Sequence, residues 1–314
     1  MVDSREFEWI GHHISLRDVV VEGIVKCPEP LRVGSGRETG KFSPIDLPIV
    51  KVYNVAEGKE TPVIPGSSWK GVFRSTAYRL CVVNGLNVCA GIPRQTCLRG
   101  REFQAIERSN VPNEIEAKIK AILDGTIRVC LLCLIFGGPG IYSHVVFSES
   151  LPIGEFRLGY RTCVAIDRRT GAAHPRALYN VEYVEPGVEF GFSLTARNLP
   201  NYALGLLANI IMEIHNGIVR VGGGKSRGFG RVMFPVEKLK VKIKTYGEKG
   251  KLEEGVLRGL DPLDSEVDLG ITEPEVEGKE AWRVIEALST AWTNSLSKLR
   301  RVSESNWKWG IITS

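Results

Sequence analysis

Apolar residues recur at two spacings along this chain, and those spacings predict a mixed α+β fold. Runs with two-residue alternation predict strands, and apolar residues three or four apart predict amphipathic helices. The expected strands are 19–26, 48–53, 144–147, 163–166, 181–184, 190–196 and 232–243, and the expected helices are 67–80, 114–123, 204–214 and 282–299. The order of these elements is typical of a split βαβ, ferredoxin-like (RRM-like) domain with insertions after its first strand and first helix.

The same pattern divides the chain into a main domain and an extension. We place the main domain at residues 1–245, with a cysteine-bearing insertion over about 84–140. We interpret residues 246–314 as an acidic linker and an amphipathic C-terminal helix. Four of the six tryptophans lie in the last 33 residues. We therefore expect this tail to dock on an apolar surface, either of its own domain or of a partner subunit.

Composition excludes several classes of protein. With 314 residues, 43% hydrophobic and 25% charged, the chain has the make-up of an ordinary globular protein. Its longest apolar stretch, residues 129–136, is far shorter than the ~20 residues that a bilayer requires. Glu6, Glu8 and His12 interrupt any N-terminal signal sequence. We expect a cytoplasmic protein with no membrane partner.

Charge is unevenly distributed along the sequence. Residues 252–280 hold two basic and ten acidic side chains of the 41 basic and 36 acidic in the chain, so the remainder holds 39 and 26 and carries a net charge of +13. A basic body with an acidic segment suggests an anionic partner. The alternative is that the uneven charge only keeps the protein soluble.

Two basic segments are suited to phosphate. Residues 65–74 open a helix and carry Ser67, Ser68, Lys70 and Arg74. Residues 219–226 end like a nucleotide-binding P-loop, but Val219 stands where that motif needs glycine, and the loop runs from helix to strand instead of strand to helix. We therefore discount an ATPase. A flexible cationic loop remains, which can approach a sugar-phosphate backbone closely, and its relevant residues are Gly223, Gly224, Lys225, Ser226 and Arg227. The alternative for both segments is that their basic side chains are simply solvated, on an ordinary helix N-terminus and an ordinary loop.

The seven cysteines suggest metal binding or core packing, because a chain of this length does not need disulfides. A tetrahedral zinc site needs four soft ligands. Cys81 lies on an expected helix and reads as core, and His144 is a possible substitute ligand. The best quartet is Cys89, Cys97, Cys130 and Cys133. Spacing alone leaves buried structural cysteines as an equal alternative.

Asp46 stands in the long loop after the first strand, without a histidine or second carboxylate beside it. A lone loop aspartate is usually a turn former, so spacing alone assigns it no catalytic role.

Three motifs together resemble the RAMP superfamily, and more closely the Cas seven family of backbone subunits in type III (Csm/Cmr-like) CRISPR interference complexes. The motifs are Ile64–Gly71 with Arg74 shortly after, the glycine-rich residues 222–232, and Ile166–Gly171. The resemblance covers roughly residues 17–236. Family members usually have leucine where this chain has Trp69, a departure that we expect to affect packing only.

The resemblance implies a palm that binds guide CRISPR RNA, associates with further copies along it, and meets other subunits of the complex. It also implies a thumb hairpin over about 160–185 that contacts the duplex of guide and complementary target RNA. The RNA-contacting residues there would be Arg168, Arg169, His174 and Arg176. In the family a Cys-x-x-Cys followed by Phe-Gly, here residues 130–137, often belongs to a structural zinc site.

Asp46 gains a role from the same resemblance. Family members that cut target RNA carry a catalytic aspartate in this loop, in a context similar to residues 43–50 here. The resemblance implies that Asp46 acts as a base or helps a divalent cation such as Mg²⁺, so that a 2′-hydroxyl attacks the adjacent phosphate. Arg37 and Lys41 would steady the charge.

Two alternatives stay open. The chain can be a backbone subunit that binds RNA without cutting it. A guide-processing endoribonuclease of the related RAMP branch would need a His or Tyr base near the glycine-rich loop, but His215, which precedes that loop, lies on an apolar helix.

Overall fold

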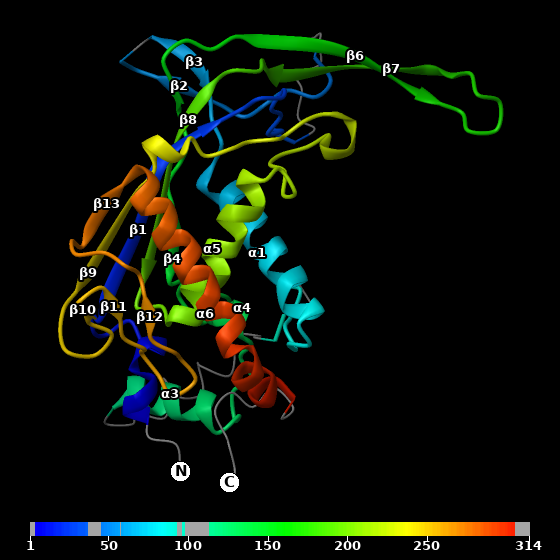
Figure 1. Cartoon of the computed structure of the whole chain (residues 1–314). Helices are drawn as coiled ribbons and strands as arrows, with labels where there is room; N and C mark the ends of the chain where they lie inside the picture. The colour runs from blue at the N-terminus through cyan, green and yellow to red at the C-terminus, as the bar shows by residue number, and fades with distance from the viewer. Residues whose placement is uncertain (1–3, 37–44, 57, 93–95, 98–112, 305–314) are drawn as a thin grey trace.

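The computed structural model of the chain is organised around one antiparallel sheet (Figure 1). It describes residues 4–36, 45–56, 58–92, 96–97 and 113–304. The strand order is β13-β9-β1-β8-β4, and β5 pairs with another part of β8. The strands are β1 (Arg17–Lys26), β4 (Val145–Phe147), β5 (Pro152–Ile153), β8 (Glu189–Arg197), β9 (Lys240–Thr245) and β13 (Glu275–Glu277).

Alternation of apolar and polar residues gives this sheet one buried face. In the register of the central strands, Val21 of β1 lies between Leu194 of β8 and Val241 of β9, and all three side chains are buried. Three helices lie together on one side of the sheet in Figure 1, namely α1 (Gly66–Val83), α5 (Asn201–His215) and α6 (Gly278–Glu304). The observed class is therefore α+β, as the sequence pattern predicts.

Helix α6 packs closely along α5, so the described part of the C-terminal helix docks on its own chain. Gly205 of α5 permits the approach, because a Cβ atom there would lie 2.5 Å from the carbonyl oxygen of Leu288. Ile285, Leu288 and Trp292 are buried in this contact. Trp307 and Trp309 lie outside the described residues.

A long hairpin projects from the body of the molecule (Figure 1). Its strands β6 (Leu158–Ile166) and β7 (Ala173–Val184) pair antiparallel and extend beyond the short strands expected at 163–166 and 181–184. A second, shorter hairpin is formed by β2 (Lys51–Asn54) and β3 (Lys59–Pro62).

The strand expected over residues 232–243 is shorter in the structure than its apolar pattern predicts. Only residues 240–245 form β9, because Pro235 is followed by a 3-10 turn, η3 (Val236–Lys238), and Met233 makes a single bridge to Lys26. The other short helices among the described residues are η1 (Ser4–Ile10), η2 (Lys225–Arg227), α3 (Glu114–Leu123) and α4 (Leu131–Phe136). Within the described residues, no helix combines the length and the apolar character that a membrane crossing requires.

The acidic segment between β9 and α6 is folded onto the main sheet rather than extended. Its strands β10 (Leu252–Glu253), β11 (Val256–Leu257) and β12 (Val267–Asp268) form a small sheet, and β13 joins the main sheet beside β9. Ion pairs cover this edge: Lys242 of β9 contacts both Glu275, 3.1 Å away, and Glu22, 3.8 Å away.

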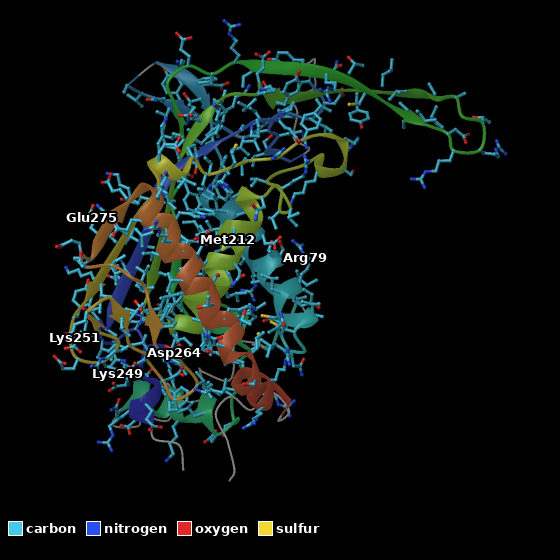
Figure 2. The ribbon with its side chains drawn as sticks, viewed as in Figure 1. Arg79, Met212, Lys249, Lys251, Asp264 and Glu275 are labelled. Carbon is cyan, nitrogen blue, oxygen red and sulfur yellow. The ribbon has the colours of Figure 1, made fainter. Side chains whose placement is uncertain are left out.

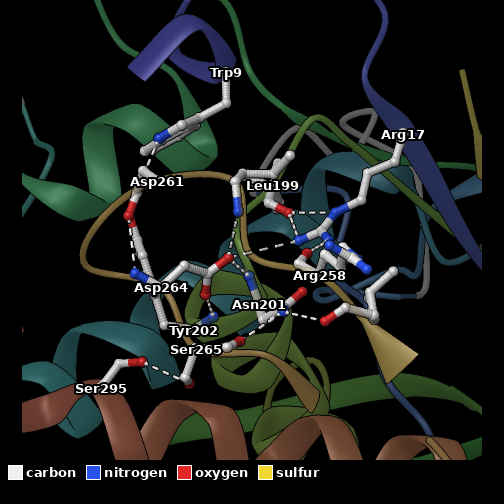
Figure 3. A network of polar contacts seen from close by, with 12 residues as sticks. Trp9, Arg17, Leu199, Asn201, Tyr202, Arg258, Asp261, Asp264, Ser265 and Ser295 are labelled. Atoms are coloured by element: carbon white, nitrogen blue, oxygen red, sulfur yellow. Dashed lines mark hydrogen bonds and ion pairs between the residues drawn. The ribbon is translucent and has the colours of Figure 1, made fainter. Parts of the chain in front are cut away.

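A buried polar network fastens this segment to the body (Figure 3). The Asp264 carboxylate accepts hydrogen bonds from the backbone N–H groups of Asn201, Tyr202 and Leu260, and it lies 4.0 Å from the guanidinium of Arg17. Arg17 is fully buried, and burial lowers its pKa to about 10, although the charge of Asp264 acts in the opposite direction.

Asp261 extends the network to the N-terminus. Its Oδ2 accepts from the indole N–H of Trp9 and from the hydroxyl of Tyr202, each at 2.8 Å. Burial, and next the neighbouring charge of Asp264, raise the pKa of Asp261 to about 6. The network thus joins four segments that are distant in sequence: η1, β1, α5 and the acidic segment.

Candidate nucleic-acid interface and metal centre

The glycine-rich loop is laid against the chain segment that follows β1. The N–H of Gly223 donates to the carbonyl of Arg32 at 2.7 Å, and the N–H of Gly230 donates to that of Pro30 at 2.9 Å. A Cβ atom on Gly222 would lie 2.1 Å from the Arg32 carbonyl oxygen, and both Gly222 and Gly230 have positive φ. Only glycine fits these positions. Gly222 and Gly230 therefore fix the path of the loop.

This loop presents cations at the surface. Lys225, Ser226 and Arg227 form the short turn η2 and are exposed. Partial burial, and next the positive charge of Arg79 on α1, lower the pKa of Lys225. The Arg227 guanidinium donates a 2.8 Å hydrogen bond to the hydroxyl of Tyr179 on β7. The loop thus faces α1 on one side and the base of the long hairpin on the other.

The start of α1 is anchored by its tryptophan. Trp69 is fully buried, donates its indole N–H to the hydroxyl of Ser150 at 2.8 Å, and packs edge-on against Phe192. Pro65 is the N-cap residue, and no side chain caps the first turn. Ser67 is exposed and Ser68 is half-buried.

The two basic residues of α1 have different surroundings. Partial burial, and next the charge of Arg74, lower the pKa of the half-buried Lys70. Arg74 points into the protein, where its guanidinium donates to the carbonyl of Gly137 at 2.8 Å and to the Cys133 sulfur at 3.3 Å. Arg74 therefore links α1 to the cysteine-bearing segment.

Four cysteines form one compact cluster. The sulfur atoms of Cys89, Cys97, Cys130 and Cys133 all lie within 4.8 Å of one another. The Cys89–Cys133, Cys97–Cys133 and Cys89–Cys130 separations are 3.3, 3.5 and 3.6 Å. A tetrahedral ion with metal–sulfur bonds of about 2.3 Å sets neighbouring sulfurs about 3.8 Å apart. The cluster therefore has the composition and the spacing of a metal site.

The other candidate ligands lie outside this cluster. Cys81 is fully buried in the core, on the same face of α1 as the buried Ala77 one turn earlier. The His144 ring lies against the carbonyl of Arg197, 2.9 Å away, and stacks on His12. Burial, and next the charge of His12, lower the pKa of His144 to about 4. The quartet chosen from spacing is the set that the structure brings together.

Asp46 lies at the base of the long hairpin. Its carboxylate is exposed and accepts a 2.7 Å hydrogen bond from the backbone N–H of Asn180 on β7. The backbone N–H of Asp46 donates back to the Asn180 carbonyl at 3.2 Å. Arg37 and Lys41, expected beside Asp46, lie outside the described residues.

The basic residues of the hairpin lie at and near its tip. Arg168 and Arg169 are exposed in the turn between β6 and β7, where the Asp167 carboxylate accepts the Arg169 N–H at 2.8 Å. His174 is exposed at the start of β7. Arg176 belongs to β7, and its side chain lies outside the described residues.

His215, the possible base of a guide-processing enzyme, packs against a neighbouring helix. It ends α5 and its ring packs on Trp282 of α6, with ring centroids 4.6 Å apart. This contact fits the core or cap role that the sequence suggests for it.

Sequence reasoning missed a pocket of about 220 Å³ between the hairpin, the glycine-rich loop and the segment after β1. Arg32 and Arg161 line it together with Arg227. The only available signal was the two-residue spacing of Arg161 and Cys163 on one strand face, and nothing in the sequence near Arg32 indicates its position.

The family relationship agrees with this geometry. The RAMP superfamily model matches residues 24–233, which is more than half of the chain, so the chain belongs to the RAMP superfamily. It is also similar to a protein of Methanocaldococcus jannaschii described as the CRISPR system Cms endoribonuclease Csm3. The two are 25% identical over 266 residues, which cover 80% of this chain and 93% of that protein.

Proposed function

We propose that this chain is a guide-RNA-binding backbone subunit of a type III CRISPR ribonucleoprotein that cuts complementary target RNA through Asp46. One observation carries the proposal. Arg227 of the glycine-rich loop contacts Tyr179, and Asp46 contacts Asn180, the next residue of the same strand. A cationic glycine-rich loop and an exposed carboxylate thus meet at the base of one hairpin. Superfamily membership and the description of the Methanocaldococcus relative as an endoribonuclease support the same conclusion.

The proposed chemistry needs one carboxylate near a locally distorted phosphate. Asp46 takes the proton of the target's 2′-hydroxyl, and a divalent cation such as Mg²⁺, if held by its carboxylate, would stabilise the negative charge that develops. The resulting oxyanion attacks the adjacent phosphorus, the bond to the 5′-oxygen breaks, and the leaving oxygen takes up a proton from water. The products are a 2′,3′-cyclic phosphate and a 5′-hydroxyl. Exposure of the Asp46 carboxylate leaves it accessible to RNA.

The architecture fits a palm of the ferredoxin-like type. The order β9-β1-β8-β4, with α1 after β1 and α5 after β8, is that of the split βαβ motif. We interpret residues 1–245 as this palm, 84–140 and 160–185 as its insertions, and 246–314 as an extension. In the proposed assembly the subunit acts in the cytoplasm, associates with further copies along the guide, and contacts other subunits of the complex.

RNA affinity is expected to depend on the glycine-rich loop. The double variant Lys225→Ala/Arg227→Ala should weaken guide-RNA binding by about tenfold or more at physiological salt, because it removes two phosphate contacts. The slope of log affinity against log salt should become shallower by about 1.4, at about 0.7 per contact with single-stranded RNA. Fluorescence anisotropy over a salt series measures both quantities.

The matched control is Lys249→Ala/Lys251→Ala, which removes the same charge at the opposite end of the body from the hairpin (Figure 2). Its affinity and slope should stay close to those of the unmodified protein. Equal losses in the two double variants would show that binding responds to total charge and not to this loop.

The cysteine cluster is proposed to hold structural zinc. The purified protein should contain one zinc per chain, because four thiolates in tetrahedral spacing suit this ion. Cys133→Ser should remove it and lower the thermal midpoint, since the metal ties α4 to the segments that carry Cys89 and Cys97. Plasma mass spectrometry and calorimetry check this expectation.

Cys163→Ser is the control for the zinc experiment, because Cys163 is half-buried on β6 and lies outside the cluster. It should keep the full zinc content. An unchanged zinc content in Cys133→Ser would rule out the proposed site.

A further inference from the structure

A second pocket lies at the end of the body opposite the long hairpin, and the proposed function does not use it (Figure 1). It has a volume of about 310 Å³ and lies between η1, α3 and the loop that follows α4. Its apolar lining comes from all three segments and consists of isoleucines: Ile10, Ile115, Ile119, Ile122 and Ile141. The three that belong to α3 recur at helical spacing, so they share one face of that helix.

The mouth of this pocket leaves apolar surface exposed. Ile115 and Tyr142 both line it, yet they are 39% and 80% exposed. The ring of His12 meets the Tyr142 ring edge-on, with 5.8 Å between the ring centroids. Exposed apolar side chains around an apolar pocket are typical of a surface that another group covers.

The pocket is suited to an indole ring. An apolar cavity of about 150 Å³ holds one benzene molecule, so a pocket of about 310 Å³ has room for two fused rings. A buried indole also needs an acceptor for its N–H group. Burial lowers the pKa of His12, which lines the pocket, so its imidazole is neutral at neutral pH and keeps one acceptor nitrogen.

The C-terminal segment 305–314 supplies indoles that have no assigned place. The four tryptophans among the described residues are already packed in the protein, with Trp9, Trp69 and Trp292 buried and Trp282 half-buried. Trp307 and Trp309 belong to the segment 305–314, which also carries Ile311 and Ile312. An apolar segment and an uncovered apolar pocket are thus present in the same chain.

The segment 305–314 starts within reach of the pocket. The described part of α6 ends at the same end of the body as α3 (Figure 1). Near that end, Lys298 donates to the carbonyl of Asp264 at 3.2 Å. Asp261, three residues earlier, accepts from Trp9, which precedes the pocket-lining Ile10. The ten residues 305–314 span up to about 33 Å when extended.

We infer that the segment 305–314 docks on its own chain and places the indole of Trp307 or Trp309 in this pocket. The second indole lies over Tyr142 at the mouth, because residues two apart in an extended segment face the same side. Attachment to α6 gives the segment an effective concentration on the order of millimolar at the pocket, which favours it over the same segment of a second copy. The docked segment ties α3 to α6. The inference does not depend on RNA binding.

Lys308, between the two tryptophans, is a built-in reporter of docking. Trypsin cleaves after lysine, and the rate of cleavage follows the fraction of chains in which the segment is undocked. Limited digestion of the full chain with mass spectrometry measures the loss of residues 309–314, and each rate is divided by that of the matching free peptide. Trp307→Ser/Trp309→Ser should be cleaved at least about tenfold faster than the unmodified protein, since burial of an apolar side chain shifts an equilibrium by that factor or more.

A pocket variant changes the docking surface and leaves the segment itself intact. Ile115→Asp/Tyr142→Asp should accelerate cleavage at Lys308 by the same factor, because it places two charges at the mouth of the pocket. Val55→Asp/Ile218→Asp is the matched control: these side chains are 84% and 74% exposed, and neither lines the pocket. It should leave the rate unchanged. Equal acceleration by the two double variants, or none by the pocket variant, overturns the inference.

Cross-linking identifies what covers the pocket. Tyr142→benzoylphenylalanine places a photoreactive group at the mouth, and an equal mixture of unlabelled and isotopically labelled full-length protein is illuminated. Cross-links should join position 142 to residues 305–314 of the same chain, so the two cross-linked peptides should always carry the same label. Pairs with mixed labels would place the segment of a second copy in the pocket. Mixed pairs, or cross-links that never include residues 305–314, overturn the inference and leave the proposed function standing.

Discussion

Asp46→Ala is expected to reduce target cleavage by the assembled complex by at least about 100-fold, the usual cost of removing a general base. Guide-RNA affinity should stay within about twofold, because the phosphate contacts of the glycine-rich loop remain. The carboxylate accepts a hydrogen bond from the backbone N–H of Asn180. Cleavage of labelled complementary RNA under single-turnover conditions, alongside guide binding, separates the two quantities.

Asp46→Asn distinguishes catalysis from loop positioning. Its amide oxygen still accepts the Asn180 N–H, so the loop keeps its anchor, but it cannot take a proton. Both variants should therefore be inactive. The matched control is the same substitution at Asp268 in the acidic segment. Its carboxylate likewise accepts a backbone N–H, that of Gly270, at 2.8 Å. Cleavage at an unchanged rate by Asp46→Asn would show that the Asp46 carboxylate is not the general base.

The second large effect is expected in stability. Asp264→Ala should lower the free energy of unfolding by about 3–5 kcal/mol, because it removes the ion-pair partner of the buried Arg17. It also removes the acceptor of three backbone N–H groups, two at the start of α5 and one in the loop between β11 and β12. Urea denaturation followed by tryptophan fluorescence measures the change.

Asp264→Asn should fall between the unmodified protein and Asp264→Ala, since it keeps one oxygen acceptor and loses the charge. Glu277→Ala is the surface control: it breaks the exposed ion pair with Lys240, and such pairs contribute little. A loss in Asp264→Ala no larger than that in Glu277→Ala would mean that the network in Figure 3 does not hold the acidic segment to the body.

Local patterns were sufficient to predict much of the fold. Strict alternation over residues 190–196 predicted β8, and helical spacing after Pro65 predicted α1. The helix over 114–123 was predicted with its observed bounds. The final strand was predicted too long, because its apolar residues at 232–239 pack as irregular chain around Pro235.

Contacts between distant segments could not be predicted from local patterns. Asp46 and Asn180 are separated by 134 residues, and Arg17 and Asp264 by 247, so no local spacing reports either contact. The cysteine quartet could be chosen because its residue type is chemically distinctive. Arginine is not chemically distinctive in this way. The spacing of Arg74 on α1 suggested phosphate binding, yet its guanidinium contacts Gly137 and Cys133 inside the protein.

Native mass spectrometry of the purified chain with guide RNAs of increasing length tests the central claim most directly. A backbone subunit that repeats along a guide should bind in copies whose number rises stepwise, with a constant number of added nucleotides for each added copy. Lys225→Ala/Arg227→Ala should weaken every step, and Lys249→Ala/Lys251→Ala should not. A stoichiometry that does not change with guide length, or no RNA complex at all, would contradict the assignment of this chain as a guide-RNA-binding backbone subunit.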